Sequence, residues 1–178
     1  NNNQLRWTLS GPTGVGPVSF TGTDGYYAGG NVIRDLPAGT YEIAVSFANA
    51  SVICYQLGLR DLAAAQALTL GTEAQAVLNP GNSHKAFKFS WPGGDAPVYI
   101  QSNSVEGPRS YWRMIGPDGA VWTQQNSDNV DFTASLGAAG TYYLLYDGQI
   151  ETTAPTTVSL TVRSSRVTGR SSTSGRWM

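Results

Sequence analysis

The sequence predicts an all-β protein: an antiparallel, jelly-roll-like β-sandwich in a tandem repeat of about 100 residues, whose first copy is incomplete. Three observations predict this fold. Short segments alternate apolar and polar residues, turn motifs rich in Gly, Pro, Asn and Asp separate them, and part of the sequence occurs twice.

The repeat links the beginning of the chain to its later part. The segment Leu5–Gly14 returns as Ser110–Gly119 at a spacing of 105 residues. The segment Leu36–Tyr41 returns as Gly137–Tyr142 at a spacing of 101 residues, because the first copy has a longer loop around 22–30. Repeated units of this kind are typical of scaffolds, spacers and binding modules.

Eight segments have the period-two alternation of half-buried strands, with their apolar residues on one face. In chain order the predicted strands are 5–9 (Leu5, Trp7, Leu9), 41–47 (Tyr41, Ile43, Val45, Phe47), 87–91 (Phe87, Phe89, Trp91), 98–100 (Val98, Ile100), 112–114 (Trp112, Met114), 130–134 (Val130, Phe132, Ala134), 142–146 (Tyr142, Leu144, Tyr146) and 158–162 (Val158, Leu160, Val162). Turn motifs lie between them, in which Pro fixes φ and Gly supplies positive φ. These turns are Gly11–Gly14, Asn79–Asn82, Pro92–Asp95, Gly116–Gly119 and Asp147-Gly148.

Three parts follow from the repeat. Residues 1–58 form a partial first β-sandwich unit, residues 59–162 a complete second unit, and residues 163–178 a Ser- and Arg-rich flexible tail. Segment 59–68 is expected to form one or two helical turns as a connector. A half sandwich exposes strand edges and an apolar face. Either residues 59–90 serve both units, or a neighbouring chain or upstream segment completes the first.

Composition points to an extracellular β-protein. Charged residues make up only 13%, against roughly 25% in an average globular protein. Four of the eleven basic residues lie in 163–178, and all twelve acidic residues precede them, so a basic patch on the folded part is not expected. This argues against nucleic acid as a partner. No apolar stretch has the length of a membrane span.

Several segments of residues 59–162 together resemble one known family. They are Leu59–Ala65, Leu68–Thr72, Leu78–Asn82, Phe87–Phe89, Trp112–Gly119 and Ala139–Leu144. They resemble the bacterial pre-peptidase C-terminal-like β-sandwich module, with residues 5–58 as a partial copy. The resemblance implies a non-catalytic module at the bacterial cell surface or outside the cell, and some related modules bind calcium or polysaccharide. An acidic residue often precedes the aromatic strand in such modules, whereas this chain has His84-Lys85-Ala86 there.

No catalytic signature stands out, and we predict that the chain is not an enzyme. The single histidine, His84, lies beside Lys85 at a junction between turn and strand, where a surface role is expected. Nucleophile-elbow, zinc-protease and phosphate-loop motifs are absent from the sequence. A hydrolase with paired carboxylates distant in sequence is a third alternative without a nameable pair.

Four aspartates of the second unit are weak candidates for a calcium site. They are Asp118, Asp128, Asp131 and Asp147. Calcium takes several oxygen ligands from loops, but Asp in Asp-Gly turns commonly serves the turn itself. No cofactor is otherwise expected.

Aromatic residues on loops or on the outward phase of strands are candidates for contact with a partner. The predicted interaction residues are Tyr26, Tyr27, Trp122 and Tyr143, and Tyr99 shares their outward phase. The leading prediction is a structural or interaction module, an adhesin or surface-assembly building block. It would pack and pair strand edges with copies of itself or neighbouring modules. The alternative is a carbohydrate-binding module of a secreted bacterial protein.

Overall fold

The computed structural model describes residues 5–13, 16–21, 36–48, 59–108, 110–119, 121–126, 131–148 and 152–164, with backbone only for 121–126. Twelve strands and one 3-10 turn lie in these ranges. In chain order they are β1 (Leu5–Ser10), β2 (Val18–Thr21), β3 (Glu42–Phe47), η1 (Leu62–Ala64), β4 (Gln66–Ala67), β5 (Glu73–Leu78), β6 (His84–Trp91), β7 (Pro97–Glu106), β8 (Ser110–Ile115), β9 (Val121–Asn126), β10 (Phe132–Ser135), β11 (Gly140–Gly148) and β12 (Thr156–Ser164).

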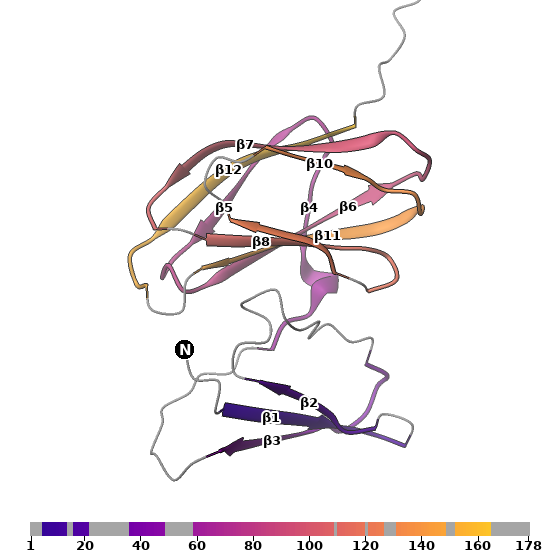
Figure 1. The fold of residues 1–178 in the computed structure, drawn as a ribbon, viewed down its shortest axis with the longest axis vertical. Coiled ribbons are helices and arrows are strands. Elements are labelled where there is room, and N and C mark those ends of the chain that lie inside the picture. Colours follow the sequence, from indigo (N-terminus) through magenta and orange to yellow (C-terminus); the bar gives the residue numbers. More distant parts are fainter. Residues whose placement is uncertain are drawn as a thin grey trace, which may run out of the picture.

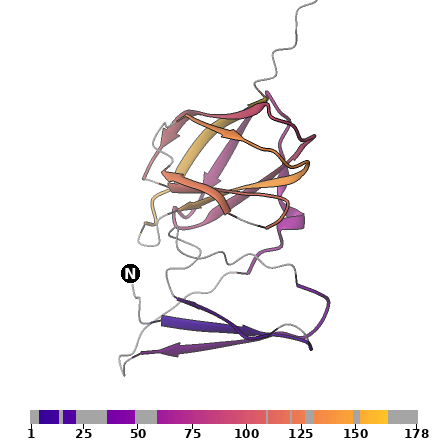
Figure 2. The same ribbon diagram turned by 45° about the vertical axis from the view of Figure 1, so that its right-hand side comes forward.

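The nine strands from β4 onward form two facing sheets (Figures 1 and 2). The five-stranded sheet has the order β4-β6-β11-β8-β9, and the four-stranded sheet has the order β10-β7-β12-β5. All pairs are antiparallel except β4 with β6. The predicted antiparallel β-sandwich is confirmed.

Large apolar side chains from both sheets fill the space between the layers. Trp112, Leu144 and Tyr146 of the five-stranded sheet are at most 2% exposed. They face Val98, Ile100, Val158, Leu160 and Val162 of the four-stranded sheet. The indole of Trp91 donates a hydrogen bond to the carbonyl of Leu136 at 2.8 Å, which satisfies its buried N–H. Period-two alternation therefore identifies the residues that face the core, although β8, β11 and β12 also bury residues of their outer phase, such as Ile115, Leu145 and Thr161.

The first three strands form a separate three-stranded sheet, in the order β2-β1-β3. In Figures 1 and 2 it lies below the five-stranded sheet. Its pairing repeats that of β9-β8-β11 residue for residue. Trp7 lies opposite Val45 and Phe20, as Trp112 lies opposite Tyr146 and Gln125. The repeat is thus confirmed at the level of strand register.

Two contacts with turn residues are repeated as well. The hydroxyl of Tyr41 donates to the carbonyl of Pro37 at 2.6 Å, and the equivalent Tyr142 donates to Ala138 at 3.0 Å. Each holds the turn before its strand to the strand itself.

The second repeated contact joins a proline of one turn to a glycine at or just before the start of a strand. Gly39 lies against Pro12, and Gly140 lies against Pro117. A Cβ at Gly140 would lie 2.6 Å from that of Pro117, and the φ of Gly140 is +150°. The close approach of a proline leaves no room for a Cβ at this position, which accounts for the glycine in both copies.

The expected helical connector, predicted as one or two turns, forms as a single 3-10 turn. Only η1 forms, with Asp61 Oδ1 accepting from the Ala63 backbone N–H at 2.8 Å, before the chain continues into β4. Strands β5 and β6 belong to the sandwich of the second unit, where β6 is paired on both edges. In the described residues, therefore, segment 59–90 does not serve both units.

Some predicted boundaries differ from the structure. The fourth apolar segment of the second unit begins at Phe132, and Val130 lies outside the described residues, as do residues 165–178 of the predicted tail. Strand β12 continues through Arg163 and Ser164, beyond the predicted end of the unit at 162. No helix in the described ranges is long and apolar enough to cross a membrane.

Candidate functional site

The most distinctive surface of the described structure is the outer edge of β3. Its equivalent, β11, is paired on one side with β8 and on the other with β6. Strand β3 is paired with β1, and none of the described strands pairs with it on its other side between Glu42 and Ser46. Within the described residues, this edge therefore leaves backbone N–H and C=O groups that another strand could pair with.

The apolar face beside this edge is also less covered than its counterpart. Trp7, Ile43 and Val45 are half-buried, whereas the equivalent Trp112, Leu144 and Tyr146 are fully buried under the four-stranded sheet. Trp7 stacks on Phe20 with ring centroids 4.1 Å apart, which organises part of the face within the sheet. We call the edge of β3 and this face, formed by Trp7, Ile43 and Val45, the β3 surface.

The opposite face of β3 is polar and exposed. Glu42, Ala44 and Ser46 alternate with the apolar residues and face away from them. Glu42 therefore places a carboxylate next to the open edge, at the end of the strand that follows Tyr41. The β3 surface thus has backbone hydrogen-bonding groups and apolar side chains, and Glu42 adds one negative charge on the other face of the same strand.

The predicted interaction residues are distributed differently. Tyr143 lies on β11, half-buried on the outer face of the five-stranded sheet, opposite Lys88 and Ile115. Trp122 lies on β9, for which only the backbone is described, and β9 is the edge strand of that sheet. Tyr26 and Tyr27 lie outside the described residues.

The three calcium candidates that the structure describes, Asp118, Asp131 and Asp147, lie in three separate places. Asp118 is exposed in the turn after β8. Asp131, just before β10, accepts hydrogen bonds from the Tyr99 hydroxyl and, at 3.2 Å, from the Ser102 backbone N–H. No three His, Cys, Asp or Glu side chains come together as a metal site in the part of the chain that is described, and Asp128 lies outside it.

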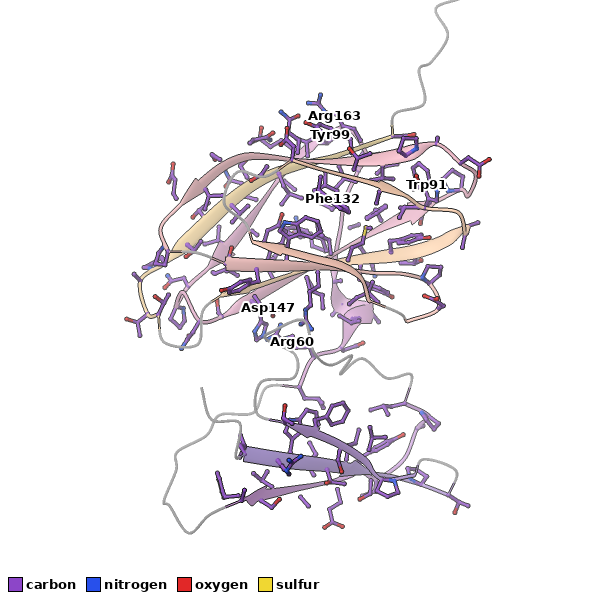
Figure 3. The ribbon with its side chains drawn as sticks, in the orientation of Figure 1. Arg60, Trp91, Tyr99, Phe132, Asp147 and Arg163 are labelled. Atoms are coloured by element: carbon purple, nitrogen blue, oxygen red, sulfur yellow. The ribbon has the colours of Figure 1, made fainter. Side chains whose placement is uncertain are left out.

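Asp147 instead takes part in an ion-pair cluster on the outer face of β11. Its Oδ2 lies 2.8 Å from Nη2 of the buried Arg113, and its Oδ1 lies 3.6 Å from Nη1 of Arg60 (Figure 3). Burial lowers the pKa of Arg60, and the Asp147 carboxylate opposes this shift. Because Arg60 lies in the connector that precedes η1, the cluster attaches the connector to the second unit.

Polar side chains from three strands lie together on the outside of the four-stranded sheet. Tyr99, Thr133 and Arg163 lie in one cross-strand row, and Figure 3 shows Tyr99 and Arg163 together on this face. The hydrogen bond to Asp131 is the main factor that raises the pKa of the Tyr99 hydroxyl. Asn103 Nδ2 donates to Thr161 Oγ1 at 3.0 Å farther along the sheet.

Sequence reasoning expected an open edge in the first unit without identifying the strand. The signal was present in the repeat, because the spacing of 101 residues makes β3 the equivalent of β11. What the sequence does not show is which strand lies beside β11 in the sheet. Strand β6 precedes it by about fifty residues and is adjacent only in the folded sheet. The cluster of Arg60, Arg113 and Asp147 was also missed, since it unites residues that are remote in sequence.

Comparisons with known proteins concern the architecture alone. No protein-family model matches the chain, and no curated protein matches it in sequence. The structure is similar to the pre-peptidase C-terminal domain of a collagenase from Bacillus anthracis, with TM-score 0.41 and 18% identity, over 56% of this chain and 94% of that one. It is also similar to PliG of Aeromonas hydrophila, a periplasmic inhibitor of g-type lysozyme, with TM-score 0.39 and 8% identity, over 56% and 96%. Neither similarity assigns a role to any residue.

Proposed function

We propose that this chain is a non-catalytic interaction module of a secreted or surface-attached bacterial protein. It associates with neighbouring modules or chains by strand addition at the β3 surface. The observation that carries the proposal is that β3 repeats β11 in register but, among the described strands, has no counterpart of β6.

Strand addition is a well-defined mode of recognition. Main-chain hydrogen bonds provide affinity, and the alternating side chains of the edge provide specificity. Each new backbone hydrogen bond contributes about 0.5–1.5 kcal/mol net, so several together with apolar burial suffice for specific association. The low content of charged residues and the wealth of Gly, Ser and Thr support a location outside the cell or on its surface. An adhesin or surface-assembly building block is the role that we favour.

The experiment is light scattering on the purified chain at concentrations from micromolar to millimolar, with two variants of β3. In the absence of another partner, we expect the open edge to pair with a second copy, so the molar mass rises with concentration. Ile43→Lys places a charge on the apolar face and should reduce association. Ala44→Lys places the same charge on the exposed polar face of the same strand and serves as the matched control.

The two variants show whether a loss of association comes from the apolar face of β3 or from the added positive charge alone. Association that only Ile43→Lys reduces supports the proposal. A wild-type chain that stays monomeric at every concentration contradicts it, as does equal association of all three proteins. Far-UV circular dichroism shows whether each variant retains its strands.

The second candidate is polysaccharide binding on the outer face of the four-stranded sheet. The row of Tyr99, Thr133 and Arg163 favours it, because a tyrosine ring beside hydrogen-bonding side chains can stack on a sugar. Affinity electrophoresis in gels containing soluble polysaccharides tests it. Retardation that is lost in Tyr99→Ala but retained in Tyr143→Ala supports it, and no retardation in any gel argues against it.

A further inference from the structure

The way β11 binds β6 indicates which kind of strand the β3 surface accepts. Strand β6 runs antiparallel to β11, with Phe89 opposite Tyr142 and Phe87 opposite Leu144. Between these pairs, Lys88 lies opposite Tyr143. The two phenylalanines are at most 2% exposed, so this edge pairing also fills the core.

The repeat carries this arrangement over to β3. Tyr41, Glu42 and Ile43 are the equivalents of Tyr142, Tyr143 and Leu144 at the spacing of 101 residues. Strand β1 pairs with β3 in the same register in which β8 pairs with β11. The residues of β3 therefore alternate between the two faces in the same order as their equivalents in β11, also along the edge that faces away from β1. A strand bound there in the manner of β6 would place apolar side chains opposite Tyr41 and Ile43.

Glu42 adds a charge preference that the second copy does not have. Its position corresponds to Tyr143, which lies opposite Lys88. A directly opposed pair of unlike charges stabilises two antiparallel strands, whereas like charges destabilise them. A basic residue between the two apolar ones would therefore suit Glu42.

We infer that the β3 surface binds an antiparallel strand of the β6 type, with aromatic or large aliphatic residues two apart and a basic residue between them. This inference rests on the proposed function and specifies its partner. The β6 strand of a second copy is already paired with β4 and β11. It could bind the β3 surface only if its own sheet opened. The natural occupant is an equivalent strand from another repeat unit.

The test uses the full chain and a fluorescently labelled synthetic peptide with the sequence of β6, His84–Trp91, with binding followed by fluorescence anisotropy. We expect saturable binding that also lowers the molar mass of any assembly of the chain. A peptide of identical composition, in which Phe87 and Lys88 exchange places, puts the two phenylalanines on opposite faces. It should bind at least tenfold more weakly, on the order expected for losing one buried aromatic contact.

A charge exchange tests the register. Glu42→Lys in the chain should weaken binding of the β6 peptide about fivefold, and a peptide with Lys88→Glu should restore it. Loss without restoration contradicts the inferred register. Ala44→Lys, on the same polar face of β3, is the matched control for net charge. The Lys88→Glu peptide should not bind the Ala44→Lys variant more tightly than the unmodified β6 peptide does, because residue 44 is not opposite Lys88 in the inferred register.

The outcomes separate this inference from the proposed function. If the chain associates through Ile43 but the β6 peptide neither binds nor dissociates the assembly, the inferred partner is wrong and strand addition between copies remains. If the peptide binds equally well to wild type and Ile43→Lys, it binds elsewhere, and the inference is overturned.

Discussion

The ion-pair cluster around Asp147 leads to a quantitative prediction for the stability of the second unit. The Arg113 side chain is only 6% exposed, and its guanidinium has Asp147 as its charged partner at 2.8 Å. Its Nε is buried with no hydrogen-bond partner in the described structure, so the carboxylate is its main compensation. Replacing Asp147 with Ala leaves a buried, uncompensated positive charge, which typically costs about 3–5 kcal/mol.

Arg60 should contribute far less. Its side chain is 31% exposed, and its nearest nitrogen lies 3.6 Å from the carboxylate. Partly solvated pairs of this kind contribute about 0–1 kcal/mol. Arg60→Gln is therefore the matched control, because it removes the weaker partner of the same aspartate.

Urea unfolding followed by circular dichroism measures these differences for the cooperative transition of the second unit. The double variant Arg113→Met, Asp147→Leu should be more stable than Asp147→Ala, because apolar side chains of similar size often replace a buried pair at little cost. An Asp147→Ala loss below about 1 kcal/mol would refute the assigned burial of this pair. So would a double variant less stable than the single one.

Three further predictions concern the core and the turns. Leu144→Ala, in the fully buried core, should lower the free energy of urea unfolding by about 2–5 kcal/mol. Ile43→Ala, at the equivalent half-buried position, should lower it by less than half as much. Equal losses would contradict the difference in burial between the two copies. Burial raises the pKa of Tyr146, which favours its neutral form in the folded state. Stability should thus be constant below the unfolded pKa of about 10 and fall above it by up to about 1.4 kcal/mol per pH unit, and the fall should be smaller in Tyr146→Phe. Gly140→Ala, with φ at +150° and Pro117 in the way, should lower the unfolding free energy by about 1–3 kcal/mol, and an unchanged midpoint would refute the close contact.

The sequence was sufficient for the sandwich and for most of its core. Strands such as β6 and β11 carry large apolar residues on one phase, and alternation reveals them directly. Strand β5 was missed because its inward positions at Ala74 and Ala76 are small, which leaves little contrast with Gln75. Strand β9 was missed because its sequence, VWTQQN, is mostly polar.

The candidate surface could be predicted only in outline. Counting strands in the repeat predicts that the first unit is incomplete, but strand order across a sheet is set by tertiary packing. The outward alternation of Tyr143 predicted exposure, yet the outer face of the five-stranded sheet is partly buried, with Leu145 at 5% exposed. Asp147 was expected in a turn as a possible ligand and instead serves an ion pair, which only the fold brings together.

Amide hydrogen exchange on the isolated chain at low concentration tests the central claim most directly. In an antiparallel strand, successive N–H groups point to alternate sides. Within Glu42–Ser46 of β3, we predict that the amides directed away from β1 exchange much faster than the equivalent amides in Tyr143–Asp147 of β11, which β6 protects. Adding the β6 peptide should slow them. Equal protection of the two strands in the monomeric chain, without peptide, would contradict the account, because the edge of β3 would then be closed by the chain itself.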